Sequence, residues 1–259
     1  MNQEEKRLYL IKYLLAENNK YDNVKIPSDE LEQKNLLRSL FNVRYPASIG
    51  ADFLNVQDEY LKEETRVKGI TDIKDLKQVE DGIYLWQGDI TTLKCDAIVN
   101  AANSGLTGCY IPCHNCIDNI IHTYAGIQLR NECNDIIMNQ GHEEETGNAK
   151  ITSAYNLPSK YVIHTVGTIV NGNVTNKNKE ELKSCYLSCL NIADENKLNN
   201  IAFCCISTGI FGFPNELAAE IAVDTVRGYR KETKTKLEVI FNVFKECDYE
   251  IYKKLLGRY

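Results

Sequence analysis

The sequence predicts an α/β fold in which a largely parallel or mixed sheet lies between two helical layers. From about residue 82, short β-rich runs alternate with helical stretches, and several runs are apolar at consecutive positions, as in strands covered on both faces. The expected strands are residues 83–87, 97–101, 161–166, 201–206 and 237–244. The expected helices of this part are residues 117–139, 178–196, 214–229 and 248–256.

The first 75 residues show a different pattern, which is helical and carries no chemical motif. Apolar residues recur every three or four positions, so they would share one face of each helix. The first such stripe comprises Leu8, Ile11, Leu14 and Leu15. Ser28 and Asp29 are candidate N-caps for a second helix. We therefore expect residues 1–75 to form a helical extension that packs on a body of residues 76–259.

Composition and charge exclude several classes of protein. Of the 259 residues, 43% are hydrophobic and 25% charged, as in an ordinary globular protein, and no apolar run approaches the roughly 18 residues of a membrane span. The N-terminus is too charged for a secretory signal. The net charge of −6 gives no overall basic surface for nucleic acid. We expect a cytoplasmic protein that binds neither nucleic acid nor membrane, with its ten cysteines mostly reduced.

Four loops at the expected carboxyl ends of strands have unusual sequences, and open α/β sheets bind ligands at this edge. They are GDIT (88–91), NAANSG (100–105), STGIFGFP (207–214) and FKECDY (244–249). Gly209 and Gly212 would let backbone amides approach a diphosphate closely, with a helix beginning after Pro214. Taken alone, these glycines are equally typical of a plain strand-to-helix turn.

The order of the motifs resembles that of the macrodomain family of ADP-ribose-binding proteins. GDIT is followed by VNAANSG (99–105), DNIIHTYAG (118–126), TGNAKITSAYNLPSKYVIHTVG (146–167) and STGIFGFP. The resemblance covers about residues 82–257. It implies a three-layer α/β/α macrodomain fold with a mixed, largely parallel central sheet and a cleft for ADP-ribose at the carboxyl ends of the strands.

The resemblance also implies which residues contact ADP-ribose. Asp89 would accept a hydrogen bond from the adenine amino group, and Phe244 would stack on the adenine. The backbone amides of residues 207–212 would surround the diphosphate, and Asn100 and Asn103 would lie along the distal ribose. The implied ligand-binding residues are Asp89, Ile90, Asn100, Asn103, Ser207, Thr208, Gly209, Ile210, Phe211, Gly212 and Phe244.

The stretch GCYIPCHNC (108–116) places three cysteines and a histidine within eight residues. It resembles the zinc-dependent subfamily of bacterial and fungal macrodomains, which also tends to carry an N-terminal helical extension. This resemblance implies one zinc ion per chain, held by Cys109, His114 and Cys116. Three protein ligands and an open position are typical of catalytic zinc, although Cys113 could close the site as a fourth ligand. A metal-free redox pair of Cys113 and Cys116 would leave Cys109 and His114 unexplained.

The function implied by the resemblance is zinc-dependent removal of mono-ADP-ribose from modified acidic side chains of proteins, with Asp118 and Asn103 as catalytic residues. Zinc would polarise an oxygen at the anomeric carbon or lower the pKa of a bound water toward about 7. Asp118 would then orient or deprotonate that water. Alternatively, Asp118 only caps the helix that starts at this point. His122 and His164 are interpreted as core residues.

Two other functions stay open. A non-enzymatic ADP-ribose-binding module with structural zinc would use Cys113 as a fourth ligand. A hydrolase of small ADP-ribose derivatives, such as O-acetyl-ADP-ribose or ADP-ribose 1″-phosphate, would use the same cleft. For the favoured enzyme, the subfamily implies a partner, a lipoyl-carrier protein that a sirtuin-type ADP-ribosyltransferase modifies.

Overall fold

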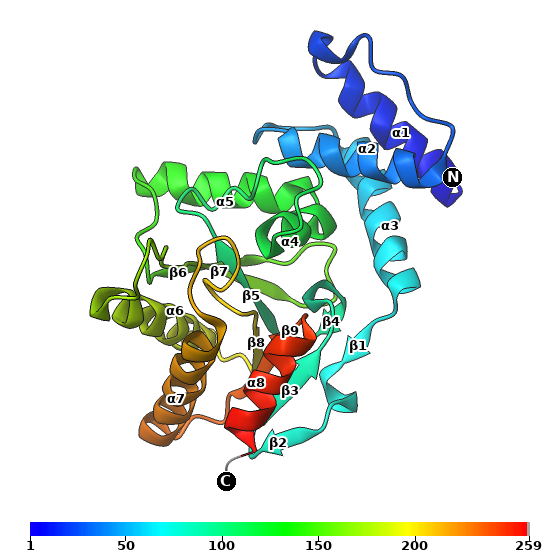
Figure 1. Ribbon diagram of the computed structural model, residues 1–259. Coiled ribbons are helices and arrows are strands. Elements are labelled where there is room, and N and C mark those ends of the chain that lie inside the picture. The colour runs from blue at the N-terminus through cyan, green and yellow to red at the C-terminus, as the bar shows by residue number, and fades with distance from the viewer. Residues whose placement is uncertain (258–259) are drawn as a thin grey trace.

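The computed structural model describes residues 1–257, which form an N-terminal group of helices beside an α/β body (Figure 1). The helices are α1 (Gln3–Ala16), α2 (Glu30–Val43), α3 (Ala51–Lys68), α4 (Ile117–Ala125), α5 (Ile127–Gln140), α6 (Asn176–Glu195), α7 (Asn215–Thr233) and α8 (Glu246–Leu256). The strands are β1 (Thr71–Asp72), β2 (Gln78–Glu80), β3 (Ile83–Gln87), β4 (Leu93–Lys94), β5 (Ala97–Ala102), β6 (Ala149–Ser153), β7 (Tyr161–Val166), β8 (Asn200–Phe203) and β9 (Glu238–Val243). Among these residues, no helix combines the length and the apolar character needed to cross a membrane.

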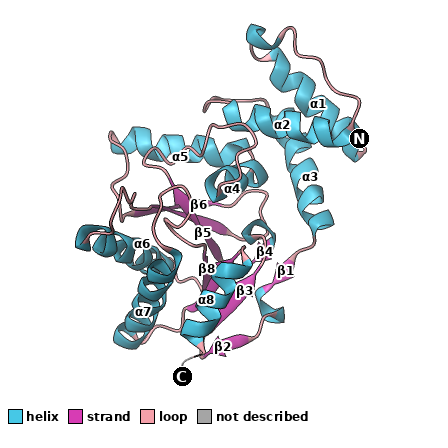
Figure 2. Ribbon diagram, viewed as in Figure 1, coloured by secondary structure: helices cyan, strands magenta, loops and turns pink. Residues whose placement is uncertain are grey.

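Within residues 1–257, seven strands form one mixed sheet in the order β2-β3-β9-β8-β5-β7-β6. Figure 2 draws the strands in magenta between the helices. The five inner strands are parallel to one another, and the edge strands β2 and β6 run antiparallel to their neighbours. The short strands β1 and β4 form a separate parallel pair. The expected fold class, with a mixed and largely parallel sheet, is confirmed.

Helices cover both faces of the sheet (Figure 1). Helices α4 and α5 lie on one face, while α6, α7 and α8 pack side by side on the other. The chain moves one way along the sheet from β5 to β7 and the opposite way from β7 to β8 and β9. Right-handed crossovers therefore place the two sets of helices on opposite faces. The carboxyl ends of β3, β9, β8 and β5 meet at one edge.

The five expected strands are all present, and the differences from the prediction are local. The strand expected at 201–206 ends at Phe203, and the helix expected at 117–139 is two helices. Gly126 separates them with a φ of +95°, in the region that favours glycine. The edge strands β2 and β6 are absent from the prediction because they are short and mostly polar.

Helices α1, α2 and α3 build an apolar core of their own. Its buried residues are Leu10, Ile11, Leu14, Leu37, Leu40, Phe41, Phe53, Tyr60 and Leu61, together with Ile127 of α5. Asp29 caps α2 by accepting from the amide of Glu32 at 2.9 Å. Both α2 and α3 contact α4, so this extension packs on the body next to the expected site. The division at about residue 75 stays a prediction.

Candidate active site and metal centre

The loops after β3, β5, β8 and β9 converge at the carboxyl edge of the sheet, where the ligand cleft is expected (Figure 1). Strand β5 leads through Asn103 and Gly108 into residues 109–116, which we call the metal loop, and then into α4. Strand β8 leads into residues 207–212, and β9 leads into Phe244. Parallel strand order thus brings together segments that lie far apart in the chain.

Asp118 lies in the first turn of α4, and its side chain is buried. The amide of Asn100 donates to its Oδ1 at 2.8 Å, and the amide of Asn103 donates to its Oδ2 at 3.3 Å. Burial raises the pKa of Asp118 to about 6, although these two hydrogen bonds and the charge of Arg130 favour the ionised form. A carboxylate that is held at both oxygens suits the role of a proton acceptor.

Asp118 does not cap α4. The N-cap is Cys116, whose Sγ accepts from the amide of Asn119 at 3.4 Å. The Asp118 carboxylate accepts from two side-chain amides and from no amide at the helix start. The alternative in which Asp118 serves only as the helix cap is therefore wrong.

Asn100 is buried in β5 and lies behind Asp118. Its Nδ2 is also 3.1 Å from Nδ1 of His164, and Nε2 of His164 is 3.0 Å from the hydroxyl of Thr152. Burial lowers the pKa of His164 to about 3, so the ring is neutral and its Nδ1 accepts from Asn100. Asn100 therefore supports Asp118 from inside the sheet, and its contact with the distal ribose stays a prediction.

His122 lies one turn after Asp118 and is also buried. Its Nε2 is 3.6 Å from Oδ1 of Asp118. Burial holds the pKa of His122 well below its usual value, so the ring is neutral. Gly108 passes over this ring with a φ of +83°, and a β-carbon at this position would lie 2.7 Å from the His122 Cγ. Glycine at 108 therefore lets the chain enter the metal loop.

The metal loop brings three potential ligand atoms together. One ring nitrogen of His114 and the Sγ atoms of Cys109 and Cys116 lie within 4.8 Å of one another. Two thiols and an imidazole form a donor set that suits zinc. Burial raises the pKa of the Cys116 thiol to about 12, and a bound cation would oppose this shift. The three residues are half-buried, which suits a site that also admits a substrate.

Cys113 faces away from this cluster. Its Sγ is 3.2 Å from the hydroxyl of Ser39 and donates to the carbonyl of Asn35 at 3.4 Å. These contacts turn the thiol toward α2, and Cys113 is not one of the three clustered ligands. The arrangement favours a three-ligand site over a site closed by Cys113.

A second group of potential ligands, His122, Cys133 and His164, lies in the interior near Asp118. All three residues are buried, and both ring nitrogens of His164 already have hydrogen-bond partners. Nε2 of His164 is also 3.6 Å from Sγ of Cys133. Core packing explains this group, in agreement with the interpretation of both histidines as core residues.

Asp89 lies after β3, at the expected adenine end. Its Oδ1 accepts from the amide and hydroxyl of Thr91 at 3.0 and 2.6 Å, and its Oδ2 is 3.1 Å from Nζ of Lys68. Burial alone would raise the pKa of Asp89, but the Thr91 hydrogen bonds and the charge of Lys68 lower it below its usual value. Phe244, whose surface is 76% exposed, offers an uncovered ring, whereas Ile90 is buried.

The loop after β8 presents free backbone amides, as expected for a diphosphate site. Within the described part of the chain, the amides of residues 208–211 donate to no protein acceptor. The amides of Gly212 and Phe213 instead close the loop, because they donate to the carbonyls of Gly209 and Ser207. Ser207 is buried, Thr208 and Phe211 are half-buried, and Gly209, Ile210 and Gly212 are exposed.

The N-terminal extension supplies site contacts that the sequence does not reveal. Lys68 of α3 reaches Asp89 and also lies 3.4 Å over the ring of Tyr124. Arg38 of α2 donates to the backbone carbonyl of His114 at 2.7 Å. Neither residue belongs to a motif, and a backbone carbonyl acceptor is present in every residue, so it gives no sequence signal. No signal in the sequence could have identified either residue.

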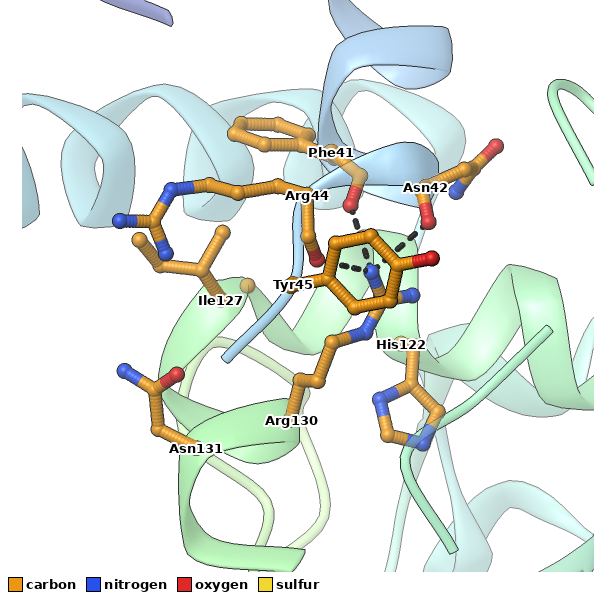
Figure 3. Close-up of a pocket in the computed structure, with 9 residues that line it drawn as sticks. Phe41, Asn42, Arg44, Tyr45, His122, Ile127, Arg130 and Asn131 are labelled. Atoms are coloured by element: carbon orange, nitrogen blue, oxygen red, sulfur yellow. Dashed lines mark hydrogen bonds between the residues drawn. The ribbon is translucent and has the colours of Figure 1, made fainter. Parts of the chain in front are cut away.

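A cavity of about 10 Å³ lies where the extension meets α4 and α5 (Figure 3). Nη1 of Arg130 donates to three carbonyls at the C-terminal end of α2 (Figure 3). They belong to Phe41, Asn42 and Arg44, at 3.0, 2.7 and 2.6 Å. The cavity has room for about one water molecule. The extension and the body are therefore tightly packed here, and the cavity is not a ligand site.

Comparisons with known proteins agree with this fold. The family model for the Macro domain matches residues 99–222. A protein-ADP-ribose hydrolase of Treponema medium is 56% identical and aligns over 99% of this chain and 100% of its own. A protein of the same name from Staphylococcus aureus (strain MRSA252) is 52% identical over 96% of this chain and 94% of its own. The chain belongs to the macrodomain family, as the order of its motifs predicts.

Solved structures show the same relationship. The Trypanosoma brucei macrodomain in complex with ADP-ribose matches with a TM-score of 0.66 and 30% identity, over 85% of this chain and 95% of its own. The Oceanobacillus iheyensis macrodomain with ADP matches with a TM-score of 0.64 and 37% identity, over 70% of this chain and 94% of its own.

Proposed function

We propose that this chain is a hydrolase that removes mono-ADP-ribose from modified acidic side chains of proteins and uses one zinc ion. The observation that carries the proposal is the position of Asp118. Asn100 and Asn103 hold both of its carboxylate oxygens, and the ligand cluster of the metal loop ends two residues before it. Two relatives that are 56% and 52% identical carry the name protein-ADP-ribose hydrolase, which supports the reaction.

The reaction breaks the bond between the anomeric carbon of the distal ribose and the carboxylate oxygen of the modified side chain. A water oxygen forms a bond to the anomeric carbon, and the side-chain carboxylate leaves with the electron pair of the broken bond. Asp118 accepts the proton that the water loses and later returns it to solvent. The products are free ADP-ribose and the restored acidic side chain.

Asn103 supports Asp118 from the side of the expected ligand cleft. It is half-buried, and its amide donates to the carbonyl of Gly108 at 3.1 Å as well as to Asp118. Its Oδ1 accepts from the amide of Gly105 at 3.0 Å. Asn103 thus fixes the carboxylate and the loop after β5 together, which limits the movement of Asp118 during the reaction.

Cys109, His114 and Cys116 would hold the zinc ion. When bound, zinc supplies Lewis-acid polarisation of an oxygen at the anomeric centre or activation of a water molecule. The orientation of Cys113 toward α2 supports a catalytic three-ligand site over structural zinc in a non-enzymatic binding module.

The proposed substrate protein is a lipoyl-carrier protein modified by a sirtuin-type ADP-ribosyltransferase, and this part rests on the subfamily resemblance alone. A cytoplasmic location belongs to the same proposal. It is supported by the ten cysteines, all of which are free in the structure, including the exposed Cys247.

Release of ADP-ribose from a modified protein tests the proposal. One carrier protein modified on acidic side chains and one modified on serine are incubated with the chain, with and without a zinc chelator. We expect release from the acidic side chains only, loss of release in chelator, and recovery when zinc is added back.

Three other outcomes would count against parts of the proposal. Undiminished release in chelator, with no zinc found by elemental analysis, would refute the zinc dependence. Binding of ADP-ribose without release would favour the binding module. Faster hydrolysis of O-acetyl-ADP-ribose or ADP-ribose 1″-phosphate than of any modified protein would favour the hydrolase of small derivatives.

A further inference from the structure

One face of α2 lies against the metal loop. Four polar residues of this helix, at positions i, i+3, i+4 and i+7, contact the loop or the start of α4. They are Asn35, Arg38, Ser39 and Asn42. The loop is therefore bounded by the body on one side and by the N-terminal extension on the other.

Arg38 makes the most direct of these contacts. Its Nη2 donates to the carbonyl of His114 at 2.7 Å and to Oδ1 of Asn119 at 2.9 Å, and its Nε is 3.3 Å from the same Oδ1. The planar guanidinium thus joins a backbone carbonyl of the loop to a side chain of α4, which a single ammonium group cannot do in the same geometry.

Asn119 carries this contact to the beginning of the loop. It is fully buried, and its Nδ2 donates to the carbonyls of Cys109 and Ile111 at 3.3 and 3.0 Å. Because Arg38 occupies Oδ1, the amide is held with Nδ2 toward the loop. Arg38 and Asn119 together fix the loop at Cys109, Ile111 and His114.

Asn42 and Ser39 hold the middle of the loop. Oδ1 of Asn42 accepts from the backbone amide of Cys113 at 2.9 Å, and Ser39 contacts the Cys113 thiol. Cys113 has a φ of +53°, which is uncommon for a residue other than glycine. The contacts with α2 hold this conformation and keep the thiol away from Cys109, His114 and Cys116.

We propose that the N-terminal extension is part of the metal centre, and that Arg38 fixes the metal loop so that Cys109, His114 and Cys116 converge before an ion binds. This inference rests on the proposed zinc site. Arg38 touches none of the three ligand atoms, so it is a positioning residue. Partners that orient metal ligands from outside typically contribute about 10- to 100-fold in metal affinity.

Other contacts attach the extension to the body, so the positioning role of Arg38 can be tested separately from the attachment of α2. Arg130 binds three carbonyls at the end of α2, and the apolar core of the extension includes Ile127 of α5. These contacts do not involve Arg38, so α2 should stay docked in Arg38→Ala. The matched control is Arg66→Ala, because among residues 1–257 the Arg66 side chain pairs only with Glu63 on the exposed surface of α3.

The experiment compares the full-length parent chain with Arg38→Ala, Arg38→Lys and Arg66→Ala. Zinc affinity is measured by chelator competition, and the ligand geometry is followed by the visible absorption of the Co²⁺-substituted protein. Hydrogen exchange of the metal-loop amides is measured in the metal-free protein. We expect both Arg38 variants to bind zinc about 10- to 100-fold more weakly, with altered Co²⁺ absorption and faster exchange in residues 109–116. Arg66→Ala should match the parent.

Zinc affinity within twofold of the parent in either Arg38 variant, with unchanged loop exchange, would overturn the inference. If Arg38→Ala does not fold, Arg38→Lys decides by the same criteria. If the parent binds no zinc, the proposed metal site fails. In that case, hydrogen exchange alone decides whether Arg38 orders the loop, with faster loop exchange supporting the inference and unchanged exchange overturning it.

Discussion

The side-chain amide of Asn100 donates to the Asp118 carboxylate at 2.8 Å, and the same nitrogen lies 3.1 Å from Nδ1 of His164. An amide nitrogen carries two hydrogens, and these two acceptors use both. His164 is in turn 3.0 Å from the hydroxyl of Thr152. This row of buried hydrogen bonds crosses β6, β7 and β5 and ends at Asp118. The carboxylate is therefore positioned by the sheet and not by a surface loop alone.

Substitution of Asp118 by alanine should slow hydrolysis strongly without abolishing the binding of ADP-ribose. Asp118 is not one of the clustered ligands and its side chain is buried, so Asp118→Ala should keep zinc and bind ADP-ribose nearly as well as the parent. Hydrolysis should fall by about 100-fold or more, the usual contribution of a positioned general base. Single-turnover release of ADP-ribose, with calorimetry for binding, measures the two effects separately.

Asp118→Asn is the sharper control for the same prediction. Asparagine preserves the size of the side chain but cannot accept the water's proton, and its NH₂ group would face an amide donor from Asn100 or Asn103. We expect a loss comparable to that in Asp118→Ala. A rate within a few-fold of the parent would show that Asp118 is not the base.

The fold and the local motifs could be predicted because their signals lie within short stretches of sequence. The inner strands are buried and therefore read as apolar runs, and Cys109, His114 and Cys116 lie within eight residues. The edge strand β6 was missed because its burial is partial and its composition mostly polar.

Contacts made by the extension could not be predicted in the same way. Arg38 meets Asn119 across 81 positions in the chain, and its other acceptor is a backbone carbonyl, which any residue provides. The burial of Asn100 could not be predicted either, because a strand residue at the carboxyl edge of a sheet can face either the cleft or the core. Only the packing of β5 against β7 places it beside His164.

Zinc should be lost only from variants that lack one of the three clustered ligands. Cys109→Ala and Cys116→Ala should each lose zinc, because either change leaves two protein ligands. Cys113→Ala should retain one zinc per chain, since its thiol contacts Ser39 and Asn35. Elemental analysis of the purified variants measures this. Zinc lost only from Cys113→Ala, or retained in both other variants, would contradict the ligand assignment.

Removal of the Asp89 carboxylate should weaken ADP-ribose binding. If Asp89 accepts from the adenine amino group, as the motif resemblance implies, Asp89→Ala leaves that group without its acceptor, which costs about 1 to 3 kcal/mol. Asp72→Ala is a matched control, because Asp72 also caps a short helical turn and pairs with a lysine, Lys94, but lies outside the expected cleft. Calorimetry should show weaker binding in Asp89→Ala alone. Unchanged affinity in Asp89→Ala would remove Asp89 from the adenine site.

Gly108→Ala should destabilise the entry to the metal loop. A left-handed conformation costs an L-residue about 1 to 2 kcal/mol, and the new β-carbon would lie 2.7 Å from Cγ of the buried His122. Gly141→Ala separates the two effects, because Gly141 has a similar φ of +79° but, apart from its chain neighbours, no described atom within 4 Å of its β-carbon position. In chemical denaturation, Gly108→Ala should lose more stability than Gly141→Ala. Equal losses of stability would mean that the His122 ring moves aside at no cost in stability.

Zinc removal and Asp118→Ala should be strongly non-additive in the rate of hydrolysis. If the ion and the carboxylate act on one water or at the same anomeric centre, each loss alone should slow release by about 100-fold or more. The two losses together should then cost much less than the product of the single effects, because groups that act as a unit are non-additive.

Rates are compared for the parent and Asp118→Ala, each with zinc and after chelation. Arg66→Ala, measured in the same way, controls for effects of the chelator on the protein. Effects that simply multiply would show that zinc and Asp118 contribute independently, and the coupled mechanism would be abandoned.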